Sequence, residues 1–230
     1  NFASAKYQSA LEKYISENFG FREAVIRLYN QYVWSLFDKT YCDNVIIGKD
    51  KWLFNKKSVK DHYEGLMTEY AKSEEELIKK FDKDIERLKK LQGLLKEHNT
   101  DIFVLMLPSK DLIYSEYLPK NTKYQKNNNV RAYDYYSKAF AENGINFLDV
   151  TKYFKEIKDS VDYPLFPQAG MHWSNIACAH TSDTIIRYME HLSGKNFPNI
   201  EVGTTYLAET RKPDNDMEKL LNLAVPINNN

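Results

Sequence analysis

The sequence predicts an α/β fold in which helices flank a layered parallel sheet. Two short apolar segments, residues 101–108 and 145–150, have the pattern of strands. Longer segments with apolar residues at three- and four-residue spacing surround them, at residues 73–98, 129–143 and 175–192. Strands that alternate with helices in this way are joined by right-handed βαβ crossovers. At 43% hydrophobic and 28% charged residues, the 230-residue chain has the composition of a globular protein.

The N-terminal part is predicted to precede this sheet as a separate extension. Residues 5–37 have the spacing of an amphipathic helix, broken near Asn18-Phe19-Gly20. Residues 45–54 contain two apolar runs around a Gly-Lys-Asp-Lys turn, the pattern of a β-hairpin. We therefore assign residues 1–72 to a helical and hairpin extension and residues 73–230 to the α/β domain.

The α/β domain is predicted to open with a long helix. Ser-Glu-Glu-Glu at residues 73–76 resembles a capping box. Residues 101–108 then form a continuous apolar run, which is typical of a parallel strand buried on both faces. The next helix ends at Gly144, the second strand follows at once, and the last helix closes at Gly194.

Composition excludes several classes of function. Lys+Arg 32 balances Asp+Glu 32, so no net charge attracts nucleic acid over a distance. Cys42 and Cys178 are too few for a disulfide framework, and no Cys/His spacing predicts a metal site. No apolar run approaches the roughly 18 residues that span a bilayer. The sequence begins at Asn1 inside a predicted helix, so we expect a targeting or anchoring segment to have been removed.

The candidate site lies where parallel strands end, because ligands of open α/β sheets bind beyond the carboxyl ends of the strands. Ser109 and Lys110 follow the first strand, Asp149 ends the second, and residues 163–175 lead into the last helix. Two prolines and a glycine keep this loop irregular and present His172 close to a helix start. The helix dipole there disfavours imidazolium, so His172 can serve as a general base. The alternative is a loop histidine that satisfies a backbone carbonyl beside a packed Trp173.

Three further residues each have a functional and a structural interpretation. Lys110 could bind a sugar or stabilise an oxyanion, or else form a structural ion pair. Trp173 could be a platform for a sugar ring or the packing anchor of its loop. Tyr114 suits either an exposed sugar-binding edge or ordinary loop packing. The other four histidines share no metal spacing and are interpreted as surface or helix-face residues.

Five blocks along the chain, in order, resemble those of a known family. They are Asn18-Phe19-Gly20-Phe21-Arg22, residues 45–54, residues 103–119 with their Leu-Pro-Ser-Lys and Tyr-Ser-Glu-Tyr-Leu-Pro, Phe147-Leu148-Asp149-Val150, and Gly170-Met171-His172-Trp173-Ser174. The chain resembles, from Asn18 to about Asn222, the SGNH-hydrolase-like acetyltransferases of the alginate O-acetylation family. The resemblance implies an SGNH-hydrolase-like, flavodoxin-like sheet.

The resemblance also implies an activity. A serine nucleophile, a histidine base and an aspartate move an acetyl group onto a sugar hydroxyl, without a cofactor, and His172 would be the base. Expected partners are a polysaccharide or oligosaccharide, an acetyl donor and a membrane-bound O-acyltransferase. The expected location is extracytoplasmic, with membrane anchoring through a removed N-terminal segment.

Two departures from the family pattern stand in this chain. Many members have an acid two residues before the histidine, where this chain has Gly170, so Asp149 or Asp162 is left to orient the ring. The family's nucleophile lies in a Gly-Asp-Ser turn, which does not occur in the 230 residues, while residues 212–223 resemble the segment before it. We therefore expect the chain to stop before its nucleophile, with Ser109 and Ser174 as weak substitutes. The alternatives are a catalytically incomplete polysaccharide-binding or scaffolding protein, or a carbohydrate acetylesterase.

Overall fold

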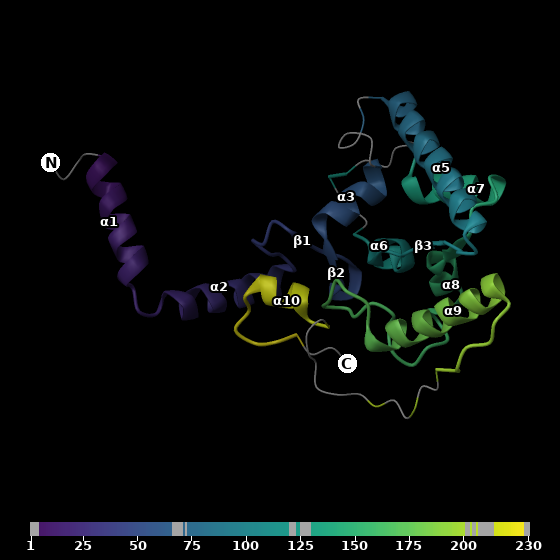
Figure 1. Ribbon diagram of the computed structural model, residues 1–230. Helices are drawn as coiled ribbons and strands as arrows, with labels where there is room; N and C mark the ends of the chain where they lie inside the picture. Colours follow the sequence, from purple (N-terminus) through teal and green to yellow (C-terminus); the bar gives the residue numbers. More distant parts are fainter. Residues whose placement is uncertain are drawn as a thin grey trace.

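The computed structural model confirms the α/β fold class and describes residues 5–65, 71, 73–119, 123–124, 130–200, 203, 206 and 214–227. Strands β3 (Val104–Met106) and β4 (Phe147–Asp149) pair in parallel, with Leu105 opposite Leu148. Figure 1 shows α5 and α7 on one side of β3 and α8 and α9 on the other. The expected layering of helices around a parallel strand pair is therefore present.

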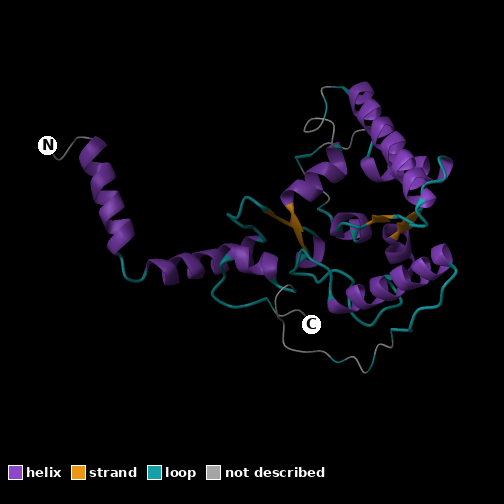
Figure 2. Ribbon diagram, in the orientation of Figure 1, coloured by secondary structure: helices purple, strands orange, loops and turns teal. Residues whose placement is uncertain are grey.

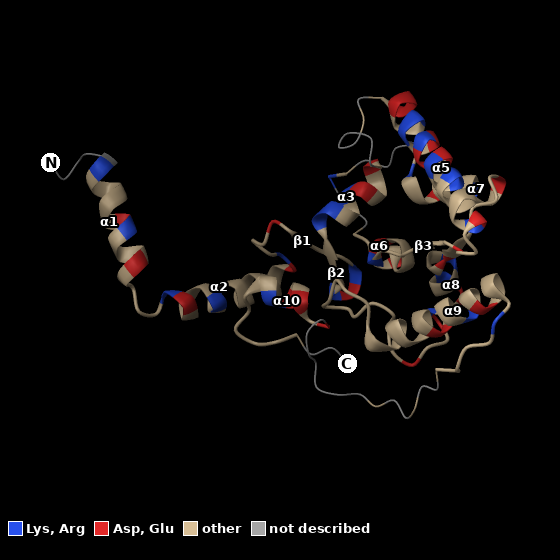
Figure 3. Cartoon of the chain, viewed as in Figure 1, with Lys and Arg blue, Asp and Glu red and all other residues tan. Residues whose placement is uncertain are grey.

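Three flanking helices lie where the apolar periodicity predicts them, namely α5 (Glu74–Glu97), α7 (Ala132–Glu142) and α9 (Asn175–Ser193). Helix α8 (Val150–Ile157) is not among the predicted helices and begins at the residue expected to end the second strand. Helix α5 begins as expected, because the Ser73 hydroxyl accepts a hydrogen bond of 3.2 Å from the backbone N–H of Glu76. Leu77 and Phe81 of α5 are buried, and acidic and basic residues mix along its outer face (Figure 3).

The N-terminal region consists of two helices and a hairpin. Helices α1 (Ala5–Asn18) and α2 (Arg22–Phe37) are separated at the predicted break and extend away from the body (Figures 1 and 2). Strands β1 (Val45–Ile47) and β2 (Leu53–Asn55) pair antiparallel, and a short 3₁₀ helix η1 (Lys49–Lys51) forms the turn. Helix α3 (Lys56–Glu64) follows directly, capped by the Asn55 side chain.

The hairpin contributes to the same hydrophobic core as the α/β elements. Trp52, Phe54 and Val59 pack in one cluster with Phe154 and Leu165. A second cluster joins the hairpin to the short helix α10 (Asp216–Leu221) near the C-terminus. The domain boundary at residue 72 stays a prediction.

One strand expectation is wrong. Residues 101–108 were expected to be buried on both faces, but Leu105 is 36% and Leu107 57% exposed. In the part of the chain that the structure describes, β3 pairs only with β4, and Leu105 and Leu107 line an open cavity instead of packing against a neighbouring element. After β3 the chain forms two short helical turns, α6 (Lys110–Ile113) and η2 (Ser115–Tyr117). No helix within the described residues has the length and apolar character needed to cross a membrane.

Candidate active site

His172 forms a hydrogen-bonded pair with Asp216, which lies at the start of α10. The ring Nδ1 of His172 lies 2.5 Å from Oδ2 of Asp216, and the backbone N–H of Met171 donates to Oδ1 at 2.7 Å. Since a carboxylate only accepts, Nδ1 carries the proton of the neutral ring and Nε2 keeps a free lone pair. The His172 side chain is 62% exposed and that of Asp216 is 24% exposed. This arrangement fixes the ring at one nitrogen and leaves the other open to a reactant.

The loop before His172 is fixed at both of its ends. Ser174 caps α9 by accepting from the N–H of Ala177, and its own N–H donates to the Leu165 carbonyl at 2.9 Å. In the middle of the loop, the Ala169 carbonyl accepts from the Glu218 N–H of α10 at 3.1 Å. The helix start and α10 therefore position His172 together, as the capping signal in the sequence indicated for α9.

Lys110 lies beneath this loop with its ammonium group surrounded by carbonyl oxygens. Its side chain passes over the ring of Trp52, with Nζ 4.9 Å from the ring centroid, and the residue is 6% exposed. Nζ donates to the carbonyls of Leu53 (2.8 Å), Pro167 (2.6 Å), Gln168 (2.8 Å) and Gly170 (2.8 Å). Burial lowers the pKa of Lys110 to about 7, and the charge of Asp216 opposes that shift. Carbonyls are available to all three N–H groups, so we propose a structural role for Lys110 rather than sugar binding.

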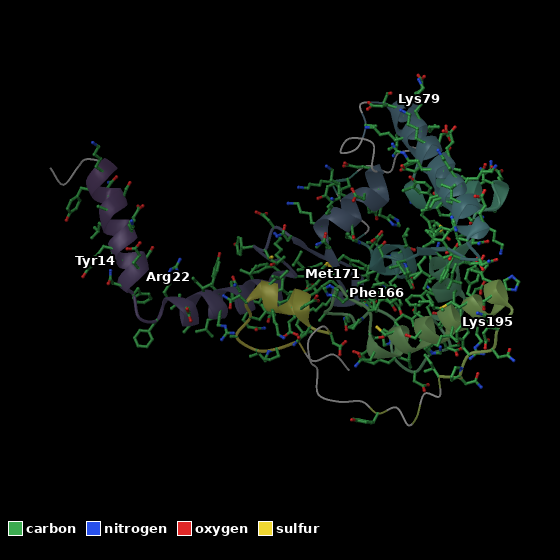
Figure 4. All side chains as sticks on the ribbon, in the orientation of Figure 1. Tyr14, Arg22, Lys79, Phe166, Met171 and Lys195 are labelled. Atoms are coloured by element: carbon green, nitrogen blue, oxygen red, sulfur yellow. The ribbon has the colours of Figure 1, made fainter. Side chains whose placement is uncertain are left out.

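A cavity of about 590 Å³ opens beside His172. Its wall brings together four of the predicted site residues, namely Ser109, Lys110, His172 and Trp173. The other residues that line it are Phe54, Asn55, Ser58, Leu107, Pro108, Asp111, Phe166, Met171, Cys178 and Met217. Figure 4 places Phe166 and Met171 in the middle of the body, away from α1. The mainly apolar wall with a few polar groups is typical of a small-molecule or sugar site.

Trp173 and Ser109 occupy different parts of this wall. The Trp173 ring packs against Phe154 and Phe166, with centroids 5.0 and 6.3 Å away, while part of it borders the cavity. It therefore anchors the loop and also offers a surface to a ligand. Ser109 precedes α6, and its hydroxyl makes no cap hydrogen bond to that helix.

Asp149 and Tyr114 have partners away from His172. Asp149 caps α8 through the N–H of Lys152 at 2.8 Å and accepts from the Tyr133 hydroxyl at 3.0 Å. Asp162 is exposed. The buried Tyr114 hydroxyl accepts from the Leu165 N–H at 3.0 Å, and burial raises the pKa of Tyr114 to about 12. Tyr114 thus packs and holds the loop, which agrees with the structural alternative for it.

Sequence reasoning missed two acidic residues at the site. Asp216 is 44 positions from His172, and no spacing rule connects them. Asp111 is 3% exposed, lines the cavity and accepts from Nδ1 of His62 at 3.2 Å, while its Oδ1 has no hydrogen-bond partner. His62 lies on the face of helix α3, as one of the two predicted alternatives has it, and its side chain is 17% exposed. Within the described residues, no group of three or more His, Cys, Asp or Glu is arranged to hold a metal ion.

The parallel strands, the cavity that follows β3 and the exposed histidine held by an aspartate fit an SGNH-hydrolase-like protein. A family model described as "SGNH hydrolase-like domain, acetyltransferase AlgX" matches residues 45–228. Because this match covers most of the chain, the protein belongs to that family.

Two solved structures resemble the chain. The O-acetyltransferase domain of Pseudomonas putida AlgJ is 16% identical with a TM-score of 0.49, and the match covers 67% of this chain and 50% of that one. Pseudomonas aeruginosa AlgX is 18% identical with a TM-score of 0.43, covering 64% of this chain and 32% of that one. The chain thus spans half or less of the length of these structures. Among curated proteins, none matched the chain.

Proposed function

We propose that the protein is an extracytoplasmic O-acetyltransferase that transfers acetyl groups to hydroxyls of a polysaccharide. The observation that carries the proposal is the His172–Asp216 pair, which leaves Nε2 free beside a cavity of sugar size. Membership of the acetyltransferase family supports the choice of reaction. Neutral imidazole with an anchored Nδ1–H is the form in which histidine accepts a proton from a hydroxyl nucleophile.

The proposed reaction has two proton-balanced steps. A serine hydroxyl attacks the acetyl carbonyl of the donor while Nε2 of His172 takes its proton, and the leaving group then takes that proton away. A sugar hydroxyl attacks the acetyl-serine, His172 accepts the sugar proton, and the serine oxygen regains it as the ester bond breaks. Asp216 stabilises the imidazolium in both steps. No cofactor takes part in this proposal.

The nucleophile is the part of the mechanism that the chain's own motifs do not supply. The Gly-Asp-Ser turn of the family does not occur in the 230 residues. Ser109 and Ser58 both line the cavity that His172 lines, so each can be tested by substitution with alanine. We further propose a membrane-bound O-acyltransferase as the partner that supplies acetyl groups, and a membrane-anchored location outside the cytoplasm.

The proposal is tested with His172→Ala in cells that produce the protein. We expect the O-acetyl content of the exported polysaccharide to fall to the level of cells without the protein, while binding of the purified protein to that polysaccharide is retained. His98→Ala, at the C-terminal cap of α5, is the matched control and should leave acetylation unchanged. Equal loss of binding and acetylation would contradict the role of His172 as base.

A second candidate is a polysaccharide-binding protein without transferase activity, and the Trp173 ring at the wall of the cavity favours it. In that case His172→Ala leaves acetylation unchanged, while Trp173→Ala weakens polysaccharide binding because the ring borders the cavity. An acetylesterase is distinguished by release of free acetate from the acetylated polysaccharide.

A further inference from the structure

Lys110 connects the His172 loop to strand β2. One ammonium group donates to Leu53 of strand β2 and to Pro167, Gln168 and Gly170 of the loop. An ammonium has three N–H groups, so four carbonyls within 2.6–2.8 Å share them and leave none for solvent or substrate. The residue begins α6, directly after the turn that ends strand β3.

The carbonyls that Lys110 holds are linked to the histidine pair by short backbone steps. Gly170 lies two residues before His172, and the next residue, Met171, donates its N–H to Oδ1 of Asp216. Gln168 is held on its other side by strand β2, because its carbonyl also accepts from the Leu53 N–H at 3.0 Å. The carboxylate of Asp216 in turn acts on the Lys110 charge. A displacement of the loop carbonyls would therefore move Met171 and the carboxylate that holds the ring.

We propose that Lys110 is a positioning residue that fixes the loop so that Asp216 holds Nδ1 of His172 and Nε2 faces the cavity. The proposal rests on the proposed function in that His172 is the base whose orientation matters. If the ammonium were replaced by an apolar side chain, four buried carbonyls would lose their hydrogen-bond donor. Unpaired buried carbonyls are unfavourable, so they would move apart or admit water. Loss of the ammonium should thus loosen the loop first and the His172–Asp216 bond as a result.

The proposal is tested on the chain itself by ¹⁵N NMR of the histidine rings, which reports the tautomer of each neutral imidazole. We expect His172, assigned by its absence from the His172→Ala spectrum, to be in the Nδ1–H form in the wild type. In Lys110→Met the bond to Asp216 is no longer enforced, so both tautomers become populated. Lys96→Met is the control, because Nζ of Lys96 also donates to an oxygen, Oδ1 of Asp101 at 3.0 Å, at the end of α5 and away from the His172 loop.

The outcomes separate positioning from plain stabilisation. A lower melting temperature in Lys110→Met together with an unchanged Nδ1–H tautomer of His172 would overturn the proposal. Should Lys110→Met fail to fold, Lys110→Gln keeps two N–H donors and is measured in its place. A wild-type experiment needs no variant: at pH 6 the Lys110 ammonium protons should exchange slowly with water, and exchange as fast as that of exposed lysines would also refute the role.

This test is independent of acetyl transfer. If the Nδ1–H tautomer of His172 dominates in the wild type but not in Lys110→Met, the positioning role is supported even when His172→Ala leaves acetylation unchanged. Conversely, loss of acetylation in His172→Ala with a tautomer insensitive to Lys110 supports the proposed function and refutes the positioning role.

Discussion

Asp216→Asn tests the catalytic assignment most sharply, because it changes the hydrogen-bond pattern while keeping the shape. The asparagine carbonyl can still accept from the Met171 N–H, which donates to Oδ1 at 2.7 Å. In the wild type, Nδ1 of His172 lies 2.5 Å from Oδ2 of Asp216. The variant places the NH₂ group of asparagine at that position, and this group can only donate hydrogen bonds. His172 must accept at Nδ1 and carry its proton on Nε2, the nitrogen that should receive the nucleophile's proton.

The expected loss follows from the wrong tautomer. In Ser-His-Asp triads the same change lowers turnover by about 10⁴-fold, and we expect a loss of that order in acetyl transfer. Stability should change little, because the variant loses one charge-assisted bond at a partly exposed site, worth about 1 kcal/mol after allowance for solvent. For a chain of this size that is a fall of about 2–4 °C in melting temperature.

The assay is the rate of O-acetyl transfer to the polysaccharide, with thermal unfolding measured on the same samples. Asp214→Asn is the matched control, since Asp214 is a carboxyl two residues away whose pKa is raised by burial and by the charge of Asp216. Transfer by Asp216→Asn within about tenfold of the wild type would refute Asp216 as the residue that orients the base.

Two predictions concern stability. Burial lowers the pKa of Lys110 from 10.5 to about 7. Between pH 7 and pH 10.5 the unfolded chain therefore binds more protons than the folded chain. The free energy of unfolding should consequently rise with pH in this range, by at most about 1.4 kcal/mol per pH unit. Urea unfolding at pH 7 and pH 9 measures this, and a wild-type slope equal to that of Lys110→Met would contradict it. Gly48→Ala makes the new Cβ collide with the Tyr117 carbonyl oxygen and should cost about 1–3 kcal/mol. Gly93→Ala, whose Cβ meets nothing within 4 Å, is its control and should stabilise the chain by about 0.5–1 kcal/mol; equal melting temperatures of the two variants would argue against the close approach.

Long periodic segments were predictable from the sequence, and short ones were not. Helix α5 has six apolar positions on one face and a capping serine, and its observed ends lie within one residue of those expected. Strands β3 and β4 and the hairpin also occur where their apolar runs predict them. Helices α6 and α10 span only 4 and 6 residues, too few for periodicity to be informative, so packing on neighbouring elements decides their structure.

The candidate site was predictable only where local signals exist. The prolines, the glycine and the cap of α9 marked the loop that presents His172. Asp216 and the carbonyls around Lys110 come together through tertiary packing across many residues, and no local pattern encodes that. The position of Lys110 after a strand drew attention to it, but its orientation beneath the loop could not be read from the sequence.

The arrangement around His172 reconciles two opposite demands on a general base. The ring must be open to a reactant, and its side chain is indeed 62% exposed, yet exposed side chains ordinarily sample several rotamers. Here the hydrogen bonds at Nδ1 restrict the ring: Asp216 accepts from Nδ1, and the Met171 N–H donates to Asp216. The Lys110 ammonium in turn links the Gly170 carbonyl to the Leu53 carbonyl of strand β2. The β-hairpin, which lies far from His172 in the sequence, is thereby part of the support of the site. Changes that weaken the hairpin should consequently lower acetyl transfer before they unfold the sheet.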